Sequence, residues 1–150
     1  MELLLNNRVL IAALVSWFLG QALKVPVEYL LKRQWNWALW FSSGGMPSSH
    51  SSLMVATTLS VGLYHGFDNP LFAIAFAISM IVVYDATGVR REAGFHAQKI
   101  NLLIEELFRG QRIPQAQLKE VLGHTPREVI AGILLGTVVA LIEYWIWPLP

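Results

Sequence analysis

The stretch Gly44–Pro70, GGMPSSHSSLMVATTLSVGLYHGFDNP, decides how this chain folds. Its central part, residues 49–66, contains no Asp, Glu, Lys or Arg, and neither do residues 70–84 that follow it. Between them, Asp68-Asn69-Pro70 is a turn signal. A membrane helix needs roughly 20 apolar residues. The stretch therefore predicts a tight hairpin of two membrane helices, at about 49–66 and 70–89.

Two further apolar segments lie outward from this hairpin. Residues 3–23 contain one charged residue, Arg8, and residues 129–147 contain one, Glu143. They predict two more membrane helices, at about 3–23 and 127–147. The first is expected to remain in the mature protein, because its start is not basic and no small-residue cleavage site follows it.

The composition supports a membrane protein of one domain. The 150 residues are 55% hydrophobic and 14% charged, and they include no cysteine. A soluble four-helix bundle is the alternative, but its helices would need a polar outer stripe that these segments lack. Disulfides, a thiol nucleophile and thiolate metal sites are excluded. We expect an all-α integral membrane helical bundle, residues 1–150, with about four transmembrane helices and an amphipathic cytoplasmic helix.

The distribution of basic residues predicts the orientation. The hairpin places residues 24–48 and 86–128 on the same side of the membrane, and ten of the eleven Lys and Arg residues lie there. These are Lys24, Lys32, Arg33, Arg90, Arg91, Lys99, Arg109, Arg112, Lys119 and Arg127. The positive-inside rule then predicts these loops in the cytoplasm and both termini outside. We expect a multi-pass protein of a bacterial plasma membrane.

The longer of these loops has helical periodicity. Apolar residues recur at near-helical spacing across 91–108, which predicts an amphipathic helix on the membrane surface or against the bundle. A second short helix is expected at 115–122. Small residues four apart, Gly132 with Gly136 and Ala73 with Ala77, suggest close helix packing.

The segment Gly44–Ser52 carries the first candidate chemistry. Pro and Ser are favoured at helix starts, so a well-capped helix explains Pro47 and every serine. It does not explain His50, or the two glycines that allow close backbone approach. A helix start with free N–H groups and hydroxyls can bind an anion, and a histidine can exchange a proton near neutral pH. Together they suggest a phosphate pocket with an acid beside it.

The segment Gly123–Val129, GHTPREV, supplies a second histidine. If helical geometry reaches His124, the Glu128 carboxylate can hold one ring nitrogen and leave the other free to attack. The alternative is a capping box, with Thr125 as the cap and Glu128 reaching back to it. Both roles are expected to coexist only if Glu128 uses a separate oxygen for each.

Cations near the two helix starts are candidate phosphate ligands. Lys24, Arg90, Arg91 and Lys119 are the candidates, although ordinary positive-inside anchoring explains most of them. Lys24 is the exception, because Pro26 could kink its helix and turn the ammonium inward. Asp85 ends an apolar segment, where an acid usually has a partner.

Three blocks resemble a known family. SGGMPSSHSS, YDATGVRR and LGHTPREVIAG resemble the divergent, small-membrane-protein branch of the type-2 phosphatidic acid phosphatase and vanadium haloperoxidase superfamily. The resemblance implies phosphate binding by Ser48 and the Ser49 backbone, with His50 as general acid. It implies that His124 attacks phosphorus while Glu128 orients it, and that no metal or other cofactor is required.

The resemblance is incomplete at several positions. Ser49 replaces a glycine of the family pattern and Glu128 replaces an aspartate. The arginine expected six residues before the nucleophile would be Leu118, with Lys119 next to it. The lysine of the family's first block falls on Lys24. Catalysis would therefore require substitute cations, among which Lys119, Arg90 and Arg91 are the candidates.

These observations predict a metal-independent membrane phosphatase. Its substrate would be a lipid phosphate monoester of the phosphatidylglycerophosphate or phosphatidic acid type, presented at the cytoplasmic leaflet. A lipid pyrophosphate phosphatase with the same residues is one alternative, and a catalytically inactive phosphate-binding membrane module is another. Membrane lipids are the expected partners and nucleic acid is not. Because four helices make a thin enclosure, a homodimer is suggested.

Overall fold

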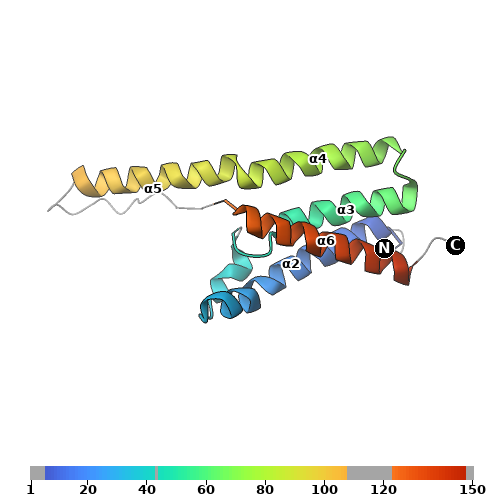
Figure 1. The fold of residues 1–150 in the computed structure, drawn as a ribbon, viewed down its shortest axis with the longest axis horizontal. Coiled ribbons are helices and arrows are strands. Elements are labelled where there is room, and N and C mark those ends of the chain that lie inside the picture. Colours follow the sequence, from blue (N-terminus) through green and yellow to red (C-terminus); the bar gives the residue numbers. More distant parts are fainter. Residues whose placement is uncertain (1–5, 43, 108–122, 148–150) are drawn as a thin grey trace.

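The described parts of the chain are mostly helical (Figure 1). This computed structural model describes residues 6–42, 44–107 and 123–147. Within them lie five α-helices and one 3₁₀ helix, and no strand, which confirms the all-α prediction. In chain order they are α2 (Arg8–Lys32), η1 (Trp37–Phe41, the 3₁₀ helix), α3 (Ser49–His65), α4 (Pro70–Thr87), α5 (Val89–Leu107) and α6 (Pro126–Ile146).

The helices have the length and the surface of a membrane bundle. The segments that are long and apolar enough to cross a bilayer are α2, α4 with its continuation α5, and α6. The shortest of the bundle helices is α3, with 17 residues. Large apolar side chains cover the outside, including Phe18, Leu31, Ile81 and Trp145. Such a surface suits hydrocarbon, where the helix itself satisfies the backbone polar groups.

Helix α3 is the centre of the bundle. It packs against α2, α4 and α6, and α2 and α4 run antiparallel to it whereas α6 runs parallel to it (Figure 1). The Arg8 guanidinium donates to the Trp147 carbonyl, and the Tyr64 hydroxyl donates to the same oxygen over 3.1 Å. The start of α2 and the ends of α3 and α6 therefore lie at one end of the bundle, and the starts of α3 and α6 lie at the other.

Small residues allow the three central helices to approach closely. A Cβ at Gly132 or Gly136 of α6 would overlap the carbonyl oxygen of Ser48 or Ser52 on α3. The predicted close packing at Gly132 and Gly136 is thus confirmed. At the contact between α2 and α3, a Cβ at Gly20 of α2 would lie 3.0 Å from the Ser49 Cα atom.

Hydroxyl groups connect the helices where the core would otherwise be apolar. The Ser16 and Ser52 hydroxyls lie 2.7 Å apart between α2 and α3, and Ser52 also donates to the Ser16 carbonyl. The Thr58 and Ser79 hydroxyls lie 2.7 Å apart between α3 and α4. Interhelical hydrogen bonds of this kind are a recognised source of helix association in membranes.

The first helix differs from its prediction. It was expected at about 3–23, but α2 begins at Arg8 and continues to Lys32, with Pro26 inside it. Proline removes one backbone hydrogen bond from a helix, and a membrane helix tolerates that loss when neighbouring groups compensate. Lys24 is therefore not at the helix end, since eight residues of helix, about 12 Å, follow it.

Helix α4, the third predicted membrane helix, also differs from its prediction in how it packs, and the amphipathic helix has few neighbours in the described chain. Ala73 and Ala77 are exposed, so the close packing expected of them is wrong in this structure; Ser79 and Ala86 are the buried residues of α4. The helix predicted at 91–108 is α5, which continues almost in line with α4 and, among the described helices, contacts α4 alone (Figure 1).

Candidate functional site

Direct backbone contacts bring the candidate segments together. The Ser48 N–H donates to the Glu128 carbonyl over 2.9 Å, which joins the start of α3 to the first turn of α6. The His124 N–H donates to the Ala86 carbonyl over 3.0 Å, which joins the residue before the α6 cap to the last turn of α4. Segments distant in sequence therefore meet at one end of the bundle.

His124 is held by the carboxylate four residues after it. The His124 Nδ1 atom lies 2.9 Å from Glu128 Oε2. The same oxygen accepts the Thr125 N–H over 3.1 Å, and the Thr125 hydroxyl accepts the Glu128 N–H, completing a capping box. The expectation that the two roles need separate oxygens is wrong, because one carboxylate oxygen can accept two hydrogen bonds.

The second ring nitrogen of His124 is buried and unused. Only 4% of the His124 surface is exposed, and Nε2 has no hydrogen-bond partner among the described residues. A carboxylate accepts from a protonated Nδ1, which leaves the lone pair on Nε2. A buried polar atom without a partner costs about 1–3 kcal/mol. Nε2 therefore has a lone pair that is held in a fixed direction and accepts no hydrogen bond from the described residues.

The serines at the start of α3 have different surroundings. Ser48 is the N-cap, and its hydroxyl oxygen accepts the Ser51 N–H over 3.3 Å and the Ser51 hydroxyl over 3.0 Å. The capping interpretation is thus confirmed for Ser48, whose own O–H can still donate. Ser49 is 1% exposed, and its hydroxyl has no partner in the described chain. Gly20 provides the space that the Ser49 side chain occupies.

Lys24 is the buried cation of the site. Its residue is 0% exposed, and its ammonium donates to the Ser42 carbonyl over 2.7 Å. Its aliphatic chain runs beneath Gly45, whose φ of +91° favours glycine. The Glu128 carboxylate interacts with the ammonium electrostatically. Lys24 thus brings positive charge from α2 to the end of the bundle where α3 and α6 begin.

The remaining predicted site residues are more dispersed. His50 is exposed on the first turn of α3, and Asp85 is half-buried beside Ala86, the residue that binds the His124 backbone. The Arg91 guanidinium lies over the Phe95 ring on α5, 5.4 Å from its centroid. Lys119, the Arg90 side chain and the predicted helix 115–122 lie outside the described residues.

Sequence reasoning predicted Lys24 but missed Gly20, Gln21 and Ser42, which also shape the site. Gly20 admits Ser49, while Gln21 and Lys24 share the Ser42 carbonyl as an acceptor. The spacing Ser16-x₃-Gly20-x₃-Lys24 places small and polar residues on one face of α2, and it was the signal available in the sequence. As for metal ions, no three His, Asp or Glu side chains in the described ranges gather closely enough to bind one.

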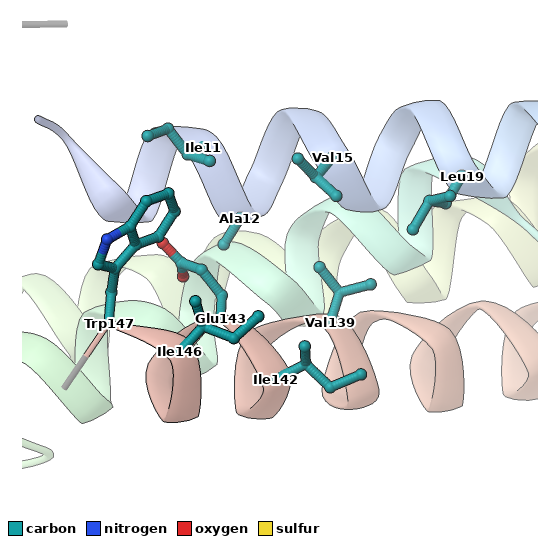
Figure 2. Close-up of a pocket in the computed structure, with 9 residues that line it drawn as sticks. All are labelled: Ile11, Ala12, Val15, Leu19, Val139, Ile142, Glu143, Ile146 and Trp147. Atoms are coloured by element: carbon teal, nitrogen blue, oxygen red, sulfur yellow. The ribbon is translucent and has the colours of Figure 1, made fainter. Parts of the chain in front are cut away.

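A separate groove at the opposite end of the bundle contains a buried acid. Figure 2 shows this groove, about 240 Å³, between α2 and α6, with Glu143 extending from α6 toward α2. Glu143 is 8% exposed, and neither carboxyl oxygen has a hydrogen-bond partner in the described chain. Because Glu143 lies near the Arg8 end of the bundle, it is not part of the site around His124.

Comparison with known proteins supports the resemblance. A family model described as "Divergent PAP2 family" matches residues 5–139. The Uncharacterized membrane protein YuiD of Bacillus subtilis (strain 168) is 39% identical, in an alignment that covers 93% of this chain and 95% of that protein. No solved structure matches the chain.

Proposed function

The chain belongs to the Divergent PAP2 family, and from that membership we propose that it is a membrane phosphatase acting on a lipid phosphate monoester. The main support for this proposal is the hydrogen-bonded pair formed by His124 and Glu128. Nδ1 is bonded to Glu128, and Nε2 is buried with its lone pair unused. An oriented imidazole of this kind is the arrangement that nucleophilic catalysis requires.

The proposed reaction has two steps. In the first, the His124 Nε2 lone pair forms a bond to phosphorus while the bond from phosphorus to the lipid oxygen breaks, and His50 gives its proton to the departing alkoxide. In the second, water attacks phosphorus and gives a proton to His50 while the bond from phosphorus to His124 Nε2 breaks, which restores the Nε2 lone pair and releases inorganic phosphate. The Glu128 carboxylate stabilises the positive charge that His124 acquires.

Positioning and charge supply most of the catalysis of phosphoryl transfer. Lys24 provides a buried ammonium, of which one N–H bond is used by Ser42. Ser49 provides a buried hydroxyl with its hydrogen-bonding capacity unspent. We assign both to the non-bridging phosphate oxygens, together with the N–H groups at the start of α3. Arg90, Arg91 and Lys119 are further candidates for this role.

The distribution of basic residues supports an orientation with the site facing the cytoplasm. Ten of the eleven Lys and Arg residues fall within residues 24–48 and 86–128 of the sequence, and Arg8 lies at the end of the bundle opposite His124. This favours phosphatidic acid or phosphatidylglycerophosphate made inside the cell as substrates of the inner leaflet.

The test is to trap the intermediate. Protein purified in detergent is mixed with lipid monophosphates and diphosphates carrying radioactive phosphate, then denatured in alkali and analysed for phosphohistidine. We expect label from a monophosphate on wild-type protein, none on His124→Ala, and unchanged labelling on His65→Ala, since His65 ends α3 at the opposite end. Label from diphosphates alone would indicate a pyrophosphatase. Binding without label or phosphate release would indicate an inactive module.

A further inference from the structure

A groove lies one helical turn from Lys24 on α2. It has a volume of about 260 Å³ and is formed by α2 and η1. Its lining residues are Trp17, Phe18, Gln21, Ala22, Trp40 and Phe41. A cavity of about 150 Å³ lined by apolar side chains can hold a benzene ring, so this groove has room for a larger apolar group.

The groove joins the candidate site through a single carbonyl group. The Gln21 side chain donates to the Trp40 and Ser42 carbonyls, and the Lys24 ammonium donates to the same Ser42 carbonyl. Gln21 and Lys24 are three residues apart, so they are separated by about 4.5 Å along the helix axis. The apolar groove therefore lies beside the buried ammonium, since Gln21 of the groove and Lys24 donate to the same carbonyl.

The lining of the groove indicates the chemistry of its occupant. Gln21 is its one polar residue, and the Gln21 amide is already bonded to two carbonyls of the same loop. Phe18 and Phe41 are 65% and 94% exposed, so the groove opens toward the lipid. A molecule with a negative charge at one end and a hydrocarbon chain at the other would match the ammonium and the groove together.

We propose that the groove between α2 and η1 holds an acyl chain of the lipid phosphate whose phosphate group lies between Lys24 and His124. This proposal rests on the proposed function and names the substrate as a long-chain lipid. The groove does not act through the hydrophobic effect, because a chain in the bilayer is already out of water. It acts by packing one chain in place and so aligning the phosphate with Nε2.

The first experiment measures occupancy without requiring turnover. Trp17 and Trp40 line the groove, so bromine atoms on a bound chain should quench their fluorescence. The protein is placed in phosphatidylcholine vesicles, and two samples are compared. One contains phosphatidate with brominated chains, and the other contains the same amount of phosphatidylcholine with brominated chains. We expect stronger quenching by the phosphatidate. The additional quenching by phosphatidate should diminish in Trp40→Phe and in Ala22→Phe, which fills the groove. It should persist in Trp145→Phe, the control at the opposite end of the bundle.

The second experiment measures the consequence for turnover. Leu23→Phe is the matched control for Ala22→Phe, because Leu23 is the next residue and does not line the groove. Displacement of the phosphate by about 1 Å can slow a reaction roughly 100-fold. We expect Ala22→Phe to slow dioleoyl phosphatidate hydrolysis more than about tenfold, with Leu23→Phe close to wild type.

The outcomes separate this inference from the proposed function. Equal quenching by the two brominated lipids, or an excess that survives Ala22→Phe and Trp40→Phe, would overturn the groove assignment even if the protein is an active phosphatase. Excess quenching that these variants remove, without phosphate release from any lipid, would retain the groove and overturn the phosphatase. Hydrolysis that Ala22→Phe and Leu23→Phe slow equally would also count against the groove.

Discussion

Glu128 combines two roles at a single oxygen, and the roles can be separated by mutation. Oε2 accepts from His124 Nδ1 and from the Thr125 N–H. The first bond orients the nucleophile of the proposed reaction, and the second stabilises the start of α6. The two roles should respond differently to changes at Glu128 and at Thr125.

Glu128→Gln should preserve the helix and impair catalysis. Glutamine also completes a capping box, so the melting temperature should change little. A neutral amide cannot stabilise a charged imidazolium, and phosphate release should fall by about 100-fold or more. Thr125→Ala should show the opposite pattern, a loss of about 1 kcal/mol in stability with nearly unchanged activity per folded molecule. Equal effects of both variants on both quantities would contradict the separation.

Glu143 should be a destabilising residue. Its carboxyl oxygens are buried and have no hydrogen-bond partner in the described chain. A buried polar group without a partner costs about 1–3 kcal/mol in proteins. Glu143→Leu should therefore raise the melting temperature in detergent, whereas Glu128→Leu, which breaks two hydrogen bonds, should lower it. A lower melting temperature for Glu143→Leu would show that the acid has a stabilising partner.

At the scale of elements, the bundle depends on glycines that touch backbone. A Cβ at Gly136 would overlap the Ser52 carbonyl oxygen of α3, a rigid group that cannot rotate away. Gly136→Ala should destabilise the protein by about 1–3 kcal/mol, measured by thermal unfolding in detergent. Leu134→Ala on the same helix is the control, because Leu134 is 62% exposed and should change stability by less than about 0.5 kcal/mol.

The starts of α3, α4 and α6 could be predicted from the sequence, and the bounds of α2 could not. Ser48, Asn69 and Thr125 cap α3, α4 and α6, where local hydrogen bonds mark the start. The end of α2 was placed nine residues early, because Lys24 and Pro26 resemble a helix terminus. In fact, Lys24 is accommodated inside the bundle by the Ser42 carbonyl.

Contacts of the candidate site within one chain segment could be predicted from the sequence, whereas contacts between separate helices could not. His124 with Glu128 follows from spacing along one chain segment, and the structure contains that contact. The bond from His124 to Ala86 and the contact of Gly20 with Ser49 depend on how separate helices are aligned. A single sequence carries no record of that alignment, so these neighbours could not be identified before the fold was known.

For the whole molecule, the orientation across the membrane can be tested with single cysteines, since the natural sequence has none. Asp68→Cys in the α3–α4 turn should react with an impermeant maleimide on intact cells. Gln34→Cys before η1 and Thr125→Cys before α6 should react only after lysis. Labelling of all three positions after lysis is the control. Reaction of Gln34→Cys on intact cells would place the candidate site outside.

The short length of α3 has a consequence for the membrane around the protein. Its 17 residues span about 26 Å, whereas the 25 residues of α2 span about 38 Å. A hydrocarbon core of about 30 Å is thicker than α3, so we expect Ser48 and Ser49 to lie in a recess below the head-group plane. A substrate must sink into that recess, or the bilayer must thin locally to deliver it. We therefore expect bilayer thickness to affect the rate of the proposed reaction, with thinner membranes presenting the phosphate at the level of His124.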